Sequence, residues 1–423
     1  MRNDFKPQWL CLENWVYASI RPGQFMLYNT RTGQYIISQE EQPRAIVEKM
    51  HERQNLGVVL LEKEWADNAA TWQFINEAIE KEIFSFEAYR EGALKPIRLM
   101  PVLNIQKNVE RLKQESDRSV GETALPYLTE LTLYVNSQCS LDCKHCGRSL
   151  QQFLCCSKDN NTLSLDLSTL EKIATQIKYA SILKLNIVGG DIFSYPLLDK
   201  ISEIFGDKKD KIHFWTHYRN CGIIDGKKSP RQASPATPPK MEGNWNIIVD
   251  FPVDEQILSQ CIAAVGKESA QYRCHFIVHN EEEINLVEKM TNRLHIQDYE
   301  MHPYYNGENI DFFKTCVFPT QDDILGNTVS QRRIFCNQAL NSNFFGSLTV
   351  LPNGDVVANI NKPVLGNITT TSVLELITKE LEDNTAWRKT RDEKPCSECL
   401  FQYLCPPMSN YEMALNCNNL CLL

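Results

Sequence analysis

The sequence predicts an α/β protein whose central part is a parallel sheet, with a smaller α+β module before it and a cysteine-rich domain after it. Strand and helix patterns alternate from residue 131 to about 313, which is typical of a parallel sheet with crossover helices. Three short strands and two helices precede this region, and clustered cysteines follow it. We expect a module at 1–95, a linker at 96–125, a core at 126–315 and a last domain at 316–423.

Composition limits the kinds of function to consider. The 423 residues allow two or three domains. A net charge of −9 argues against a nucleic-acid-binding surface. No secretory signal opens the chain, and no apolar stretch approaches the ~20 residues that span a bilayer. From the charge and the lack of a long apolar stretch we expect neither a nucleic-acid nor a membrane partner. The sixteen cysteines are clustered, which indicates metal binding in a reducing cytoplasm rather than disulfides.

The first 95 residues read as a β-meander followed by helices. Turn residues separate three short runs rich in β-branched and aromatic residues, and apolar residues recur at helical spacing further on. A polar helix at 105–115 belongs to the linker. The predicted elements of the module are strands at 15–20, 24–28, 34–37 and 58–61 and helices at 40–51 and 67–81.

Three cysteines follow the first strand of the core, 131–135, at C-x3-C-x2-C spacing: Cys139, Cys143 and Cys146. Three thiolates this close in sequence can converge on one metal centre. An ordinary Fe–S cluster has four cysteine ligands, so three leave one iron open to a substrate or cofactor. A zinc site and unrelated reduced thiols remain alternatives, although zinc sites favour C-x2-C pairs.

A second motif, Gly189-Gly190-Asp191, ends the next predicted strand at 183–188. Two glycines allow a ligand to approach the backbone closely, and the acid can accept a hydrogen bond from an ammonium group. A plain turn is the alternative. Asp250 ends a later strand and is either a ligand contact or an N-capping residue. The other predicted core elements are strands at 212–216, 245–249, 272–278 and 296–301, helices at 167–177, 254–265 and 281–293, and a loop at 226–243.

The cysteine motif, with the Gly-Gly-acid motif one βα unit later, resembles the radical S-adenosylmethionine (radical SAM) superfamily. The resemblance implies a partial (βα)6 barrel, a [4Fe–4S] cluster whose free iron binds SAM, and reductive cleavage of SAM to a 5′-deoxyadenosyl radical. Two residues depart from the family pattern: His145 replaces an aromatic residue, and Asp191 replaces a glutamate. By this resemblance Cys139, Cys143 and Cys146 hold the catalytic cluster, Gly189, Gly190 and Asp191 hold SAM, and Asp250 contacts its ribose.

The C-terminal hundred residues contain Cys396-x2-Cys399-x5-Cys405 and end near Cys417 and Cys421. This pattern resembles the SPASM domain, the auxiliary-cluster domain of radical SAM peptide maturases. Asn359 and Ser409 stand where that family has cysteines, so the first auxiliary cluster is expected to be absent. The resemblance implies one auxiliary [4Fe–4S] cluster, with a structural zinc as the alternative. Its ligands would be Cys396, Cys399, Cys405 and Cys421, or Cys417 in place of Cys421.

The element order of residues 1–95 resembles the winged-helix-like recognition element of enzymes that modify ribosomally made peptides (RiPPs). That module adds a leader peptide to its sheet edge; a structural cap is the alternative. Together the resemblances imply a radical SAM enzyme that crosslinks or epimerises a ribosomal precursor peptide. Expected partners are that peptide, an electron donor such as flavodoxin or ferredoxin, and a second maturase protein. A non-catalytic peptide-binding partner and a sulfatase-maturase-type enzyme stay open.

Six further cysteines have no partner spacing and are interpreted as buried or incidental thiols. They are Cys155, Cys156, Cys221, Cys261, Cys274 and Cys316.

Overall fold

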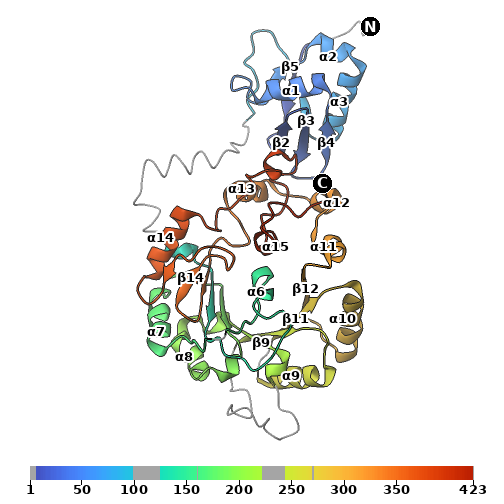
Figure 1. Ribbon diagram of the computed structural model, residues 1–423. Helices are drawn as coiled ribbons and strands as arrows, with labels where there is room; N and C mark the ends of the chain where they lie inside the picture. Colours follow the sequence, from blue (N-terminus) through green and yellow to red (C-terminus); the bar gives the residue numbers. More distant parts are fainter. Residues whose placement is uncertain (1–5, 99–123, 160, 222–242, 269–270, 423) are drawn as a thin grey trace.

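A computed structural model describes residues 6–98, 124–159, 161–221, 243–268 and 271–422. The N-terminal module (blue) lies at one end of the molecule and the parallel sheet (green to yellow) at the other, with C-terminal segments between them (Figure 1). The predicted helix at 105–115 lies outside the described residues, as does nearly all of the predicted loop at 226–243. Across the described part of the chain, no helix is long and apolar enough to cross a membrane.

The N-terminal module contains two three-stranded antiparallel sheets, β2–β3–β4 and β5–β1–β6. The predicted meander and helices are present. The sequence analysis did not predict β1 or β6. These two strands pair with each other although most of the module lies between them in the sequence, so no turn signal marks the pairing. The elements are β1 (Gln8–Leu12), β2 (Val16–Arg21), β3 (Gln24–Asn29), β4 (Tyr35–Ser38), α1 (Glu41–His51), β5 (Val58–Leu60), α2 (Lys63–Asp67), α3 (Ala69–Glu80) and β6 (Phe84–Ala88).

Both faces of the β2–β3–β4 sheet pack against other parts of the chain. Leu27 and Ile36 face the module core, which includes residues of α1 and α3. On the opposite face, Met26 and Tyr28 pack with Phe401 and its neighbours from the C-terminal domain. The module therefore docks on the C-terminal domain through this sheet, and only the sheet edges stay available for a further strand.

Six parallel strands form the core, and each pairs with the next one in sequence. This confirms the predicted βα alternation. Helices α7 (Leu167–Gln176), α9 (Glu255–Glu268) and α10 (Glu281–Leu294) surround the strands (Figure 1). The Asp166 carboxylate caps α7 by accepting from the Thr169 N–H. The strands are β7 (Glu130–Tyr134), β8 (Lys184–Val188), β9 (Ile212–His217), β10 (Asn244–Val249), β11 (Tyr272–Val278) and β12 (Tyr299–Pro303).

The sheet curves into a partial barrel. Tyr134 of β7 and Tyr304, which follows β12, belong to one buried cluster with side chains from the four strands between them. Side chains from these strands share one interior because the sheet bends around them (Figure 1). The short helix α6 (Ser149–Gln152) closes part of this interior, since the Gln152 amide exchanges two hydrogen bonds of 2.9 Å with the Tyr305 backbone.

The C-terminal domain extends the same sheet. β13 (Ser347–Val350) pairs in parallel with β7, on the side away from β8, and β14 (Asp355–Val357) and β15 (Gly366–Asn367) continue antiparallel. The remaining helices of this domain are α11 (Ile310–Val317), α12 (Gln321–Leu325), α13 (Gln331–Ala339), α14 (Val373–Asp383) and α15 (Asn410–Ala414).

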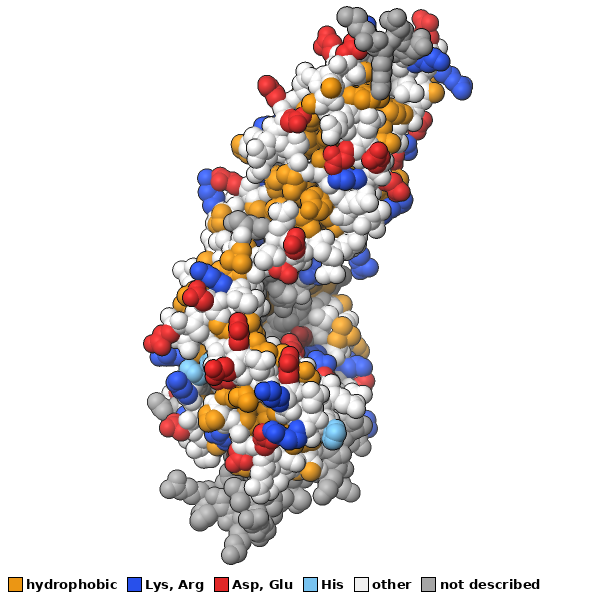
Figure 2. Space-filling view, turned by 90° about the vertical axis from the view of Figure 1, so that its right-hand side faces the viewer, with side chains coloured by type: hydrophobic (Ala, Val, Ile, Leu, Met, Phe, Trp, Pro, Cys, Tyr) orange, Lys and Arg blue, Asp and Glu red, His pale blue; other side chains and the backbone are white. Residues whose placement is uncertain are grey.

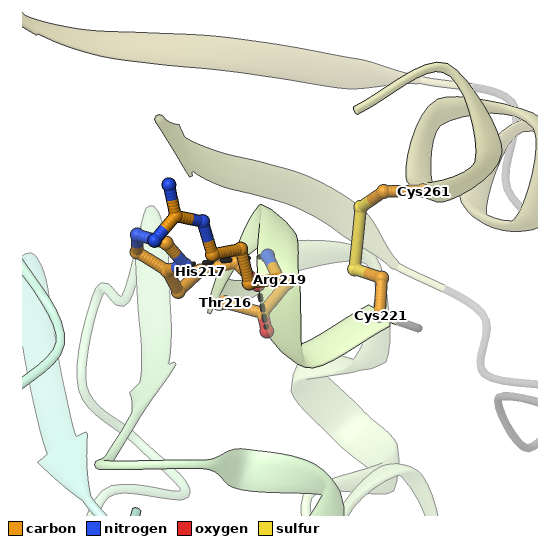
Figure 3. Close-up of a disulfide and its surroundings, with 5 residues drawn as sticks. All are labelled: Thr216, His217, Arg219, Cys221 and Cys261. Carbon is orange, nitrogen blue, oxygen red and sulfur yellow. Dashed lines mark hydrogen bonds between the residues drawn. A yellow bond between two sulfur atoms is a disulfide. The ribbon is translucent and has the colours of Figure 1, made fainter. Parts of the chain in front are cut away.

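One pair of cysteines corrects the sequence interpretation. Cys221, at the end of the short 3-10 helix Tyr218–Cys221 that follows β9, and Cys261, on α9, form a disulfide, and Figure 3 shows their side chains directed toward one another. The sequence treated them as unpaired thiols, because the 40 residues between them give no spacing pattern. They meet because α9 crosses over the segment that follows β9.

Acidic and basic side chains are interspersed on the face drawn in Figure 2, and the molecule is elongated in that view.

Candidate functional site

The three core cysteines lie in the loop that leaves the carboxyl end of β7. All three are partly exposed. The loop turns tightly, with the Cys146 N–H donating to the Cys143 carbonyl at 3.2 Å. Two of the sulfurs also accept hydrogen bonds: Cys139 Sγ from Asn220 Nδ2 at 3.9 Å, and Cys146 Sγ from the Lys158 N–H at 3.4 Å. Hydrogen bonds of this kind tune thiolate-bound iron.

The thiols interact electrostatically. Burial raises the pKa of Cys143 to about 12, with further increases from Asp250 and from the Cys146 and Cys139 thiols. Thiols held this close repel one another as thiolates, so a cation is needed to keep them all deprotonated. A cluster of positively charged iron ions meets that need, so this donor set fits the implied [4Fe–4S] group.

A cavity of about 260 Å³ opens beside the cysteine loop. Its walls come from the loop and from the carboxyl ends of β9, β10 and β11, which is where ligands bind in parallel α/β folds. Among the residues that line it are Cys143, Cys146, Cys156, His217, Asp250 and His279. The cavity thus brings the predicted Cys143, Cys146 and Asp250 together with His217 and His279, which the sequence did not single out, and with Cys156, which was interpreted as an incidental thiol.

Asp250 belongs to a hydrogen-bonded pair beside Cys143. His217 Nε2 lies 3.0 Å from Asp250 Oδ1, and Figure 3 shows His217 with Arg219 just beyond β9. Burial raises the pKa of Asp250, but the hydrogen bond and charge of His217 and the charge of Arg219 outweigh it, so the net pKa is lowered. Asp250 is therefore an anion at neutral pH. One potential metal-binding atom from each of Cys143, His217 and Asp250 lies within 4.8 Å of the other two.

The glycine pair serves a packing role in the structure. A Cβ on Gly189 would lie 2.1 Å from Asn136 Oδ1, and one on Gly190 would lie 2.4 Å from the Gln138 carbonyl oxygen. Neither residue tolerates a side chain, because the start of the cysteine loop crosses directly over them. The motif thus fixes the position of the loop, and SAM binding by these glycines stays a prediction.

Asp191 is buried, and its carboxylate accepts from the Phe193 N–H at 3.1 Å. Burial raises the pKa of this carboxyl to about 6. The charge of Asp191 raises the pKa of Cys139, so Asp191 lies near Cys139 in the cysteine loop. A binding role toward an ammonium group remains a prediction.

His145 packs on aromatic rings rather than extending into solvent. Its ring centroid lies 4.4 Å from that of Tyr304 and 5.0 Å from that of His279. Burial and the charge of His279 lower the pKa of His145, so the ring is neutral at neutral pH. It lines the cavity as an uncharged aromatic surface.

Cys156 is the main residue that the sequence interpretation missed. The Ser157 N–H donates to the Gly189 carbonyl at 3.1 Å, and Lys158 reaches the cysteine loop, so this segment packs against both motifs. The thiol of Cys156 raises the pKa of Cys139, Cys143 and Cys146. The only feature of the sequence that could have indicated a role for Cys156 is its position, ten residues after the last cysteine of the motif. His217 and His279 were identifiable only as residues that end or follow strands.

The C-terminal cysteines form a second group. Burial, offset by the charge of Arg391, raises the pKa of Cys405 to about 12, and Cys396, Cys399 and Cys421 raise it further. Cys417 instead directs its thiol to the Asn419 carbonyl at 2.8 Å. Cys421 thus interacts electrostatically with the trio, and its role as the fourth ligand stays a prediction.

Asn359 and Ser409 make ordinary structural contacts. The Asn359 amide donates to Asn410 Oδ1 at 2.6 Å, and the Ser409 side chain caps α15.

No family model matches the chain, and no curated protein matches it. Solved structures with some likeness include Streptococcus suis SuiB bound to its precursor peptide SuiA, at 14% identity and a TM-score of 0.49, over 98% of this chain and 100% of that one. SuiB bound to S-adenosylmethionine has 12% identity and a TM-score of 0.41 over the same shares. BtrN in complex with AdoMet and 2-DOIA has 12% identity and a TM-score of 0.29, over 61% of this chain and 85% of that chain. These likenesses are too low to carry an argument about function.

Proposed function

We propose that the protein is a radical SAM enzyme that crosslinks or epimerises a ribosomally made precursor peptide in the cytoplasm. The observation that carries the proposal is the set of Cys139, Cys143 and Cys146 at the end of the first parallel strand, beside a cavity at the carboxyl ends of the neighbouring strands. Three thiols, rather than four, suit a centre that binds a cofactor at an open iron.

When bound, a [4Fe–4S] cluster and SAM would supply a 5′-deoxyadenosyl radical that removes a hydrogen atom from the substrate. The protein residues have separate tasks. Asn220 and the Lys158 N–H hold two of the sulfurs by hydrogen bonds. Asp250, kept ionised by His217, offers a carboxylate to ribose hydroxyls, and Asp191 offers one to the amino group of SAM. Gly189 and Gly190 let the cysteine loop settle against β8.

The test is anaerobic reconstitution of the full chain with iron, sulfide, SAM and a reductant. We expect about eight irons per chain, four at each cysteine group, and release of 5′-deoxyadenosine. Replacing all three core cysteines with alanine should remove about four irons and abolish 5′-deoxyadenosine release. The matched control is Cys316→Ala, which removes an exposed thiol outside both groups. SAM cleavage by the triple variant would contradict the proposal.

A peptide partner is supported by the N-terminal module. Because both faces of the β2–β3–β4 sheet are covered, an extended peptide can join it only at an edge, and β4 is an edge strand with Ile37 partly exposed. Pairing along an edge supplies main-chain hydrogen bonds whatever the peptide sequence. The partner would be a short peptide encoded beside this gene.

The peptide proposal is tested in the full chain by fluorescence anisotropy with that peptide. Ile37→Lys should weaken binding at least tenfold. Leu60→Lys is the matched control, since Leu60 is similarly exposed on β5, an edge strand of the other sheet. Equal affinities for wild type and Ile37→Lys would refute the use of this edge.

One observation favours a second candidate, a non-catalytic protein that binds precursor peptide beside an active maturase. Cys156 lies with the cluster cysteines, and a fourth thiolate would close the cluster to SAM. Under this candidate, wild type has a cluster but releases no 5′-deoxyadenosine, and Cys156→Ala alters the Mössbauer spectrum. Under the enzyme proposal, SAM alters the spectrum of the wild-type cluster.

A further inference from the structure

A second group of metal-binding side chains lies on the inner face of the barrel, at the level of Ile248 and Ile277, which line the cavity. It consists of His275 on β11 and Glu300 and His302 on β12, whose ligand atoms all lie within 4.8 Å of one another. His275 Nδ1 is 2.9 Å from His302 Nε2 and 3.8 Å from Glu300 Oε2.

The register of the two strands brings these residues together. His275 is directly paired with Glu300, and His302 is two residues further along β12, opposite Ile277. Because side chains alternate along a strand, all three point to the same face. The neighbouring residues of that face, Trp215 and Ile277, belong to the interior cluster, so the three groups point into the barrel.

Both imidazole rings are held in place. Asn246 Oδ1 accepts from His275 Nε2 at 3.0 Å, which leaves the lone pair of His275 Nδ1 directed at His302 and Glu300. The ring of Trp215 lies 4.6 Å from that of His275, and the ring of Phe153 is stacked on that of His302 at 4.9 Å. A hydrogen bond from the far nitrogen and fixed ring planes are the usual support of a metal-binding histidine.

We propose that His275, Glu300 and His302 bind one divalent transition-metal ion, of the Zn²⁺ or Fe²⁺ class, through two imidazole nitrogens and one carboxylate oxygen. Two histidines and one carboxylate form a common ligand set for these ions. His275 Nδ1 and His302 Nε2 are hydrogen-bonded at 2.9 Å, and a small opening of this contact gives about 3.3 Å, the spacing of two nitrogens in a tetrahedral site with bonds of about 2.0–2.1 Å. A small rotation of Glu300 closes the remaining gap.

The surroundings allow an ion to enter and be neutralised. The Glu300 side chain is 53% exposed whereas that of His275 is 6% exposed, so an ion reaches the buried nitrogens from the Glu300 side. Arg273 Nη1 lies 4.0 Å from Glu300 but is already paired with Asp298 through Nε at 2.7 Å. The shorter contact of Arg273 is thus with Asp298, and a cation would compete only with the longer Arg273–Glu300 pair.

This centre is separate from the cavity with the cysteines. None of its three residues is among those lining that cavity, although His275 and His302 are paired in register with the lining residues Ile248 and Ile277. The ion would join β11 to β12, the edge strand of the sheet. Metal binding would thus stabilise this edge of the sheet.

The experiment counts zinc in the full-length protein after equilibration with Zn²⁺ and dialysis. Every variant keeps all of its cysteines, so zinc bound by thiols is the same throughout and the difference reports this centre. His302→Ala and Glu300→Gln should each lose one zinc per chain or bind it at least tenfold more weakly. His295→Asn is the matched control: it removes an exposed imidazole outside the centre, and asparagine suits its left-handed backbone.

Zinc contents equal to wild type in both variants would overturn the proposal, and so would loss of zinc in His295→Asn alone. If His302→Ala fails to fold by circular dichroism, Glu300→Gln decides the question, because its half-exposed side chain keeps nearly the same shape. A second readout is the Zn²⁺-dependent rise in melting temperature. It should be smaller in Glu300→Gln than in wild type, and an equal rise in the two proteins would also overturn the proposal.

Discussion

The Asp191 carboxyl gives a prediction about pH. Its pKa in the folded protein is about 6, above the ordinary value of 3.8, because it is buried. The folded state therefore holds this proton more tightly than the unfolded chain does. The stability from this group is full below about pH 4 and is lost as pH rises through about 6.

Asp191→Asn should remove this dependence, because the amide stays neutral and still accepts from the Phe193 N–H. The difference in the free energy of unfolding, variant minus wild type, should increase by about 2–3 kcal/mol between about pH 4 and pH 8. Urea denaturation of both proteins, in the same metal state, at a series of pH values measures the difference. A difference that does not change with pH would contradict the assigned cause.

The Arg391–Glu412 ion pair should be far more important for stability than the other C-terminal ion pairs. Arg391 Nη1 lies 2.7 Å from Glu412 Oε1, and the two side chains are only 11% and 3% exposed. Arg391→Met would leave a buried carboxylate without its cation, at a cost of about 3–5 kcal/mol. The control is Lys394→Met, from an exposed pair with Glu398, which should leave the denaturation midpoint unchanged.

At the scale of elements, the strands were predictable and several of their contacts were not. The six core strands read as apolar and β-branched runs, and Asp166 marked the start of α7, because alternation and capping act over a few residues. The cavity could not be predicted, because it depends on the curvature of the whole sheet. That curvature brings His217, Asp250 and His279 beside Cys143. No short-range pattern encodes that curvature, or the packing of the segment that carries Cys156 against the cysteine loop.

The glycine pair shows a related limit. The sequence predicted that Gly189 and Gly190 let a ligand approach the backbone, whereas the groups that approach them in the structure are the Asn136 side chain and the backbone at residues 136–138. A sequence shows that a position requires glycine more readily than it shows which group packs against that glycine.

The C-terminal cysteine group should be both a metal site and a support for the end of the chain. Cys399→Ala should lower the iron content by about four per chain and also lower the melting temperature, since metal-binding free energy is partly folding free energy. Cys417→Ala is the control, because its thiol is directed to the Asn419 carbonyl. Loss of one zinc in place of four irons would identify a structural zinc centre.

At the scale of the whole molecule, the N-terminal module is attached to the C-terminal domain by buried contacts. The Tyr28 hydroxyl accepts from the Val329 N–H at 2.8 Å, and the Arg21 guanidinium donates to the Gln402 side chain at 2.6 Å. An isolated module would expose Met26 and Tyr28, which are fully buried in the chain. Peptide-binding measurements therefore need the full-length protein.

Tyr28→Phe should weaken this docking. It leaves the Val329 N–H without its acceptor, which costs about 1–3 kcal/mol. Hydrogen exchange at Val329 should become faster, while amides in the core strand β9 keep their protection. Tyr89→Phe, at a partly exposed position, is the control. Unchanged exchange at Val329 would mean that water replaces the hydroxyl at no cost.

The pairing of β13 with β7 has a consequence for biosynthesis. The backbone of Gly346, next to β13, is hydrogen-bonded to Thr129, next to β7, across 217 residues. At about 5–20 residues per second, a ribosome needs about 10–40 s to make the intervening chain. During that time β7, the strand that leads into the cysteine loop, has one edge uncovered and open to pairing with other chains. A chaperone that shields this edge during translation would therefore raise the yield of folded protein.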